Sequence, residues 1–137
     1  MNIIEFKIKH STLIEQYQYI ELHLKGIYAS LSQKDFAFAL DDVEICNIHK
    51  LSQEIKEIES KNHFNVITED IYNRIDQARI RRNYWCHTCY TCMVFTTKGD
   101  PKKEEYSKNL LRDLREAENL REDLFNIKNK LLYPAPV

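Results

Sequence analysis

The chain has 137 residues, which is room for one domain built around one hydrophobic core. Hydrophobic residues make up 43% of the chain and charged residues 30%, a balance typical of globular rather than disordered proteins. Only two glycines are present, and neither Gly26 nor Gly99 belongs to a glycine-rich phosphate-binding motif. A two-domain enzyme, a Rossmann domain and a P-loop domain are therefore excluded.

The charges nearly cancel, with 20 Lys and Arg against 21 Asp and Glu. Residues 1–60 carry 6 basic and 10 acidic side chains, whereas residues 61–137 carry 14 and 11, so the second half can still present a basic face. The first ten residues mix charges into the apolar positions, unlike a signal peptide, and no apolar run has the length of a membrane span. We therefore expect a cytoplasmic protein without a membrane partner.

Few helix-breaking residues interrupt the chain, because no proline precedes Pro101 and no glycine lies between Gly26 and Gly99. This pattern favours an all-α fold. Four amphipathic segments of about 20 to 30 residues, joined by short connections, predict an antiparallel up-down bundle of four to five helices. We expect a single domain over residues 1–137, with its core over about 12–132.

The first predicted helix covers about 12–31. Its apolar residues recur with spacings of three and four and share one face: Leu13, Tyr17, Ile20, Leu24, Ile27 and Leu31. Thr12 and Glu15 stand at the spacing of a capping box at the start of this helix. The apolar positions among residues 3–8 fit either a short extended arm or an early helical turn.

The second predicted helix covers about 41–60 and carries the apolar series Ile48, Leu51, Ile55 and Ile58. The stretch 32–40 before it is ambiguous and also fits a short helical turn. The third predicted helix covers about 69–95. Thr68 is typical of an N-cap, since acidic residues follow it in the first helical turn.

Residues 96–100 form the clearest loop in the sequence. Asp100 followed by Pro101 predicts an N-cap with proline at the first helical position, so we expect the fourth helix to start there. Its core residues repeat at helical spacing: Leu110, Leu114, Ala117, Leu120, Leu124, Ile127 and Leu131. Pro134 and Pro136 are expected to end this helix.

The most unusual stretch is 79–92, within the third predicted helix. It holds three of the seven arginines, the only tryptophan and three of the four cysteines. Bulky aromatic side chains favour burial and arginines oppose it, so one helix segment faces two conflicting demands. Such conflicts are expected at functional sites.

Arg82 and His87 are separated by four residues, and the polar residue Asn83 follows the arginine. This Arg-x4-His arrangement, in an all-helical chain and ahead of a loop and a last long helix, resembles the signature of the HEPN superfamily. The resemblance implies a bundle of four or five helices that acts on RNA as a metal-independent endoribonuclease. It also implies a homodimer in which two Arg/His pairs face each other, and a toxin or phage-defence effector held in check by a protein antitoxin.

These residue types suit RNA cleavage by the neighbouring 2′-hydroxyl, which needs no cofactor. The imidazole of His87 can transfer protons, the guanidinium of Arg82 can stabilise the charge on the phosphoryl group, and Asn83 can orient either group. Arg79 and Arg81 are expected to hold flanking phosphates. Positions five apart on a regular α-helix differ by about 140° in azimuth, so one helix brings the pair together poorly and a dimer would supply second copies.

Three other interpretations stay open. The same fold can be a non-catalytic module that binds RNA or a protein. Cys46, His49, Cys86 and Cys89 have spacings that would supply four zinc ligands, although cysteine more often fills helix interfaces as a small buried residue. In the plainest interpretation, the arginine and histidine of the motif form ordinary surface contacts.

Overall fold

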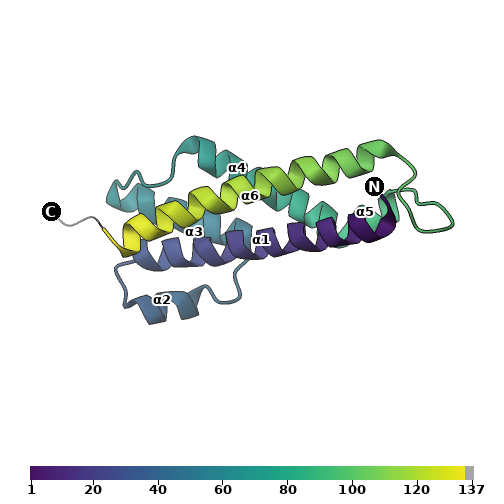
Figure 1. Cartoon of the computed structure of the whole chain (residues 1–137). Coiled ribbons are helices and arrows are strands. Elements are labelled where there is room, and N and C mark those ends of the chain that lie inside the picture. Colours follow the sequence, from purple (N-terminus) through teal and green to yellow (C-terminus); the bar gives the residue numbers. More distant parts are fainter. Residues whose placement is uncertain (135–137) are drawn as a thin grey trace.

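The computed structural model describes residues 1–134 and is built from helices (Figure 1). In chain order these are α1 (Ile3–Leu31), α2 (Phe36–Asp42), α3 (Ile48–Asn62), α4 (Glu69–Asn83), a π-helical turn (Tyr84–Thr88), α5 (Cys89–Cys92) and α6 (Glu104–Leu132). Residues 1–134 contain no β-strand beyond one isolated bridge between Phe95 and Pro101. The predicted all-α helical bundle is therefore confirmed. We call the segment Tyr84–Thr88 the π-turn.

Successive helices run in opposite directions, with α4, the π-turn and α5 forming one continuous arm (Figure 1). Because this arrangement places α1 and α6 in the same direction, the two longest helices pack side by side and parallel. At one end the backbone N–H of Ile3 donates to Asp100, and toward the other end His23 contacts Lys128. The first and last helices are therefore joined near both of their ends.

The core follows the predicted apolar stripes. All six stripe residues of the first predicted helix are buried, and α6 buries Leu110, Leu114, Ala117, Leu120 and Leu124. Ile127 and Leu131, the last two predicted positions, are half-buried against this core. The buried positions follow the predicted stripes because a helix that buries one face must repeat apolar residues at its own period. Among residues 1–134, none of the helices combines the length and the apolar character needed to cross a membrane.

Helix α1 begins at Ile3, well before the predicted start at about residue 12. The side chain of Asn2 caps it, and Phe6 is fully buried against aromatic residues near the end of the α4 arm. The predicted capping box is wrong, because the hydroxyl of Thr12 donates to the carbonyl of Ile8 within the helix. Tertiary packing of Phe6 explains why the early apolar residues are helical.

The second predicted helix, about 41–60, is wrong in its boundaries. The ambiguous stretch 32–40 contains most of α2, and the chain breaks after Asp42 before α3 starts at Ile48. Asn47 causes the new start, because its side chain accepts a hydrogen bond from the backbone N–H of Lys50 at 2.9 Å.

The third predicted helix, about 69–95, starts as expected. The hydroxyl of Thr68 accepts from the backbone N–H of Ile71 at 3.2 Å, which confirms the N-cap. The helix is not a regular α-helix throughout, however, because residues 84–88 form the π-turn, and it ends at Cys92, ahead of the predicted end at about 95.

Residues 96–100 form the expected loop, in which Gly99 adopts a positive φ of 86°. The prediction that Asp100 caps the fourth helix is wrong, since α6 starts only at Glu104. Instead, Oδ1 of Asp100 accepts from the backbone N–H of Ile3 at 2.7 Å and so caps α1 from across the chain. Helix α6 ends at Leu132, ahead of the prolines, and Pro136 lies outside the described residues.

Candidate active site at the π-turn

The predicted catalytic residues lie where α4 passes into the π-turn. Arg82 is partly buried in the last turn of α4, while Asn83 and His87 are exposed. Within residues 1–134, no side-chain hydrogen bond or ion pair engages any of these three side chains. Their donors and acceptors therefore remain available to a bound substrate.

The π-turn changes the geometry expected from a regular helix. The backbone N–H of Cys89 donates to the carbonyl of Tyr84, five residues earlier, instead of to the carbonyl of Trp85. A turn with this bonding holds one more residue than a turn of an α-helix, so each residue advances by a smaller angle around the helix axis. His87 therefore lies closer in azimuth to Arg82 than it would on a regular α-helix. The separation of about 140° applies to a regular α-helix, and a π-turn between the two residues makes the angle smaller. Turns of this kind are frequent at functional sites.

His10 of α1 supplies a donor to a carbonyl that lacks its usual α-helical donor. Its Nε2 lies 2.7 Å from the carbonyl oxygen of Trp85. Since a carbonyl can only accept, this nitrogen carries the proton. The thiol of Cys89 also reaches the same oxygen, at 3.4 Å, and lies 3.7 Å from Nε2 of His10. The imidazole ring packs edge-on against Tyr90, with ring centres 5.3 Å apart.

Asp113 of α6 holds the π-turn from the other side. The indole Nε1 of Trp85, a side chain only 1% exposed, donates to Oδ2 of Asp113 at 2.8 Å. The other carboxylate oxygen is 3.3 Å from the guanidinium of Arg81 and accepts from Arg112 at 3.0 Å. A buried carboxylate with three donors is well satisfied, so the π-turn is fixed by both long helices.

The two predicted phosphate-binding arginines both have acidic partners. Arg79 forms two hydrogen bonds with Asp76 one turn earlier on α4, at 2.9 and 3.1 Å. Arg81 pairs with Asp113 and with Glu116 of α6. Exposed pairs of the first kind contribute only about 0–1 kcal/mol, so Arg79 can exchange its partner for a phosphate more readily than Arg81 can.

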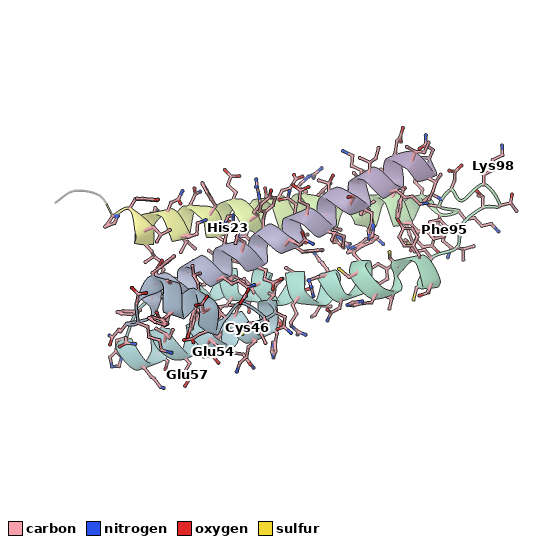
Figure 2. The ribbon with its side chains drawn as sticks, turned by 90° about the horizontal axis from the view of Figure 1, so that it is seen from below. His23, Cys46, Glu54, Glu57, Phe95 and Lys98 are labelled. Carbon is pink, nitrogen blue, oxygen red and sulfur yellow. The ribbon has the colours of Figure 1, made fainter. Side chains whose placement is uncertain are left out.

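The structure does not assemble the alternative zinc site. Residues 1–134 contain no group of three or more His, Cys, Asp or Glu side chains that could hold a metal ion. Cys46 lies beside α3, whereas Phe95, shortly after α5, lies toward the opposite end of the bundle (Figure 2). Cys86 is exposed and Cys89 is buried, and burial raises the pKa of the Cys89 thiol. A protonated, buried thiol is the less reactive form of cysteine.

Sequence reasoning missed His10 and Asp113. A signal for Asp113 exists, because it lies three residues after Leu110 and four before Ala117 and therefore shares the apolar face of α6. An acidic residue on such a face needs a buried donor. No comparable signal exists for His10, since its partner Trp85 is 75 residues away.

Comparison of the chain with family models, curated proteins and solved structures finds no match. The site is therefore interpreted from its own chemistry. That chemistry consists of an exposed imidazole, a nearby guanidinium and an amide, carried by a backbone turn that two other helices hold in place.

Proposed function

We propose that this protein is a HEPN-like, metal-independent endoribonuclease. The observation that carries the proposal is the π-turn between Arg82 and His87, because its wider winding lowers the angle that a regular helix would put between the two positions. The imidazole of His87 is exposed. Neither side chain has an acidic partner within residues 1–134. Asn83 supports the proposal, because its exposed amide lies next to Arg82 and offers both a donor and an acceptor.

In the proposed mechanism, His87 takes the proton from a ribose 2′-hydroxyl, and the resulting oxygen attacks the adjacent phosphorus. The bond between phosphorus and the 5′-oxygen breaks, and the leaving oxygen receives a proton from an imidazolium. Arg82 stabilises the negative charge that develops on the non-bridging phosphoryl oxygens. The products carry a 2′,3′-cyclic phosphate and a 5′-hydroxyl. Each step is a proton transfer or a charge stabilisation, so the reaction needs no metal.

The proposed active form is a homodimer that places two such pairs around one RNA strand. A second His87 then protonates the leaving oxygen while the first removes the 2′-hydroxyl proton. Arg79 extends the phosphate contacts along the strand. In this proposal the protein acts in the cytoplasm as a toxin or phage-defence effector, and a protein antitoxin neutralises it.

The experiment compares the wild type with Arg82→Ala and His87→Ala on mixed single-stranded and structured RNA in excess EDTA. We expect the wild type to leave 2′,3′-cyclic phosphate ends, and His87→Ala to lower the cleavage rate by about 10²–10⁴-fold. Loss of the arginine is expected to lower the rate by roughly 10²–10³-fold. Arg115→Ala and His49→Ala, which remove an exposed arginine and an exposed histidine elsewhere, serve as matched controls.

A further control replaces the ribose at the cleaved position with deoxyribose, which removes the nucleophile and should abolish cleavage. The proposal fails if both site variants keep their helical circular dichroism and still cleave at the wild-type rate. Binding of RNA without any strand scission by the wild type would instead identify a non-catalytic RNA-binding module.

A further inference from the structure

A groove of about 300 Å³ opens between α4 and α6, beside the π-turn. One wall comes from α4 through Gln77, Ala78 and Arg81, and the facing wall comes from α6 through Asp113 and Asn119. The volume is at the lower end of the range for small-molecule sites, which is about 300–1,000 Å³. It is enough for one small ring system and too little for a peptide or a folded partner.

Tyr17 of α1 lines the groove and carries a polar group without a partner. The side chain is 1% exposed, and within residues 1–134 its buried hydroxyl makes no hydrogen bond. Burial and the nearby Asp113 carboxylate raise the pKa of this hydroxyl well above its usual range, so it remains a donor. A buried donor without an acceptor is costly, and an acceptor that enters the groove removes that cost.

The charges around the groove favour an uncharged ligand. Arg81 is already paired with Asp113 and Glu116, and Arg74 is paired with Asp123 at 2.7 Å. The two arginines and the two acids that line the groove cancel. An anion or a cation would have to break one of these pairs, whereas a neutral polar molecule would leave them intact.

The remaining polar groups suit the edge of a heteroaromatic ring. Gln77 of α4 and Asn119 of α6 both line the groove, both are exposed, and within residues 1–134 neither amide makes a side-chain hydrogen bond. Each amide offers a donor and an acceptor side by side, which is the pattern that Asn and Gln use to read bases. Ala78, Ala117 and Leu120 add apolar surface to the lining of the groove.

We infer that this groove binds a single nucleobase, through the Tyr17 hydroxyl and the amides of Gln77 and Asn119. The base is either an unpaired nucleotide of an RNA strand or a free nucleoside, because both present the same ring edge. Arg81 and Asp113 line the groove, and Asp113 also accepts from Trp85 of the π-turn, so the groove adjoins the π-turn. Binding of a base that belongs to an RNA strand rests on the proposed function, whereas binding of a free nucleoside does not.

The test is calorimetric titration of the full chain, in EDTA, with adenosine, guanosine, cytidine and uridine. A second arm titrates the His87→Ala protein with a short single-stranded RNA, so that no cleavage disturbs the measurement. We expect one nucleoside to bind saturably, and Tyr17→Phe to weaken its binding about tenfold while raising the melting temperature, because it removes an unpaired hydroxyl. Gln77→Leu and Asn119→Leu should also weaken binding, whereas Gln53→Leu on the exposed face of α3 should not.

Competition between the RNA and the nucleoside would identify the RNA-borne base as the ligand, and nucleoside binding alone would identify a free nucleoside. The inference is overturned if no nucleoside or RNA binds at about 1 mM, or if the three groove variants bind as the wild type does. Nucleoside binding without any RNA cleavage would contradict the proposed function and leave the inference standing. The opposite result is RNA cleavage without nucleoside binding, in which Tyr17→Phe changes neither the cleavage rate nor the base preference. That result would overturn the inference and leave the proposed function standing.

Discussion

The imidazole Nε2 of His10 lies 2.7 Å from the carbonyl oxygen of Trp85 and joins the start of α1 to the π-turn. This carbonyl lacks its usual helical donor, because the backbone N–H of Cys89 goes to Tyr84 instead. The hydrogen bond from His10 of α1 therefore replaces the backbone donor that this carbonyl loses in the π-turn. The π-turn also carries His87. A residue outside the motif thus contacts the backbone turn that carries the motif histidine.

The contact can be tested with His10→Leu and His10→Gln. Leucine removes the donor, and we expect this to lower the free energy of unfolding by about 1–3 kcal/mol and to speed amide exchange at Cys89. Glutamine places an amide nitrogen at the position of Nε2, so most of the stability should return. Urea unfolding and hydrogen exchange measure both effects. Equal stability of the two variants would show that the hydrogen bond contributes nothing.

Trp85→Phe tests the hydrogen bond by which Asp113 of α6 holds the π-turn. The substitution keeps an aromatic ring in the core but removes the N–H that donates to Asp113, a carboxylate only 4% exposed. We expect a loss of about 1–3 kcal/mol in the free energy of unfolding, measured by circular dichroism in urea. Tyr84→Phe is the matched control, and its effect should stay within about 0.5 kcal/mol because no side-chain hydrogen bond of Tyr84 is present within residues 1–134. A smaller loss for Trp85→Phe than for the control would show that this hydrogen bond does not stabilise the protein.

His23 makes the stability depend on pH. Burial, together with the neighbouring positive charges of Lys128 and Arg121, lowers the pKa of His23 from 6.5 to about 4. The unfolded chain therefore binds a proton that the folded chain excludes between these values. The contribution of His23 to the free energy of unfolding is fully present above pH 6.5. It falls as the pH drops toward 4, by up to about 3 kcal/mol.

Urea unfolding at pH 7 and pH 4.5 measures this effect for the wild type and for His23→Gln. Glutamine does not titrate, so the variant should lose less stability on acidification than the wild type. An identical pH dependence for the two proteins would show that His23 is not the titrating group.

Gly26 leaves space for the side chain of Lys128. A Cβ atom at Gly26 would lie 2.7 Å from Cδ of Lys128, so Gly26→Ala must displace the lysine, whose Nζ is 3.1 Å from Nδ1 of His23. In a Lys128→Ala background the same change meets no lysine and should stabilise the protein by about 1 kcal/mol through helix propensity. In the wild-type background the gain should be smaller. A double-mutant cycle measured by thermal unfolding gives the difference, and additive effects would contradict the steric contact.

The helices that follow local patterns were predictable. The buried positions as far as Leu31 on α1 and Leu124 on α6 follow from apolar residues at helical spacing, although the predicted stripe of α6 continued to Leu131. The N-cap at Thr68 follows from side-chain chemistry within one turn. Asp100 shows where local reasoning stops. Its position before a proline is typical of an N-cap, yet its carboxylate caps the helix that begins at Ile3. The donor that it binds belongs to a segment that is distant in sequence.

By itself, the sequence determined the all-α class, the core faces of the long helices and the stretch 79–92 as the place where function was expected. Only the tertiary structure decided the π-turn, its attachment to His10 and Asp113, and the groove lined by Tyr17. The physical reason is the range of the interactions. Helical periodicity and caps act within a few residues, whereas a carbonyl left unpaired by a wide turn takes whichever donor the packing of other helices brings to it.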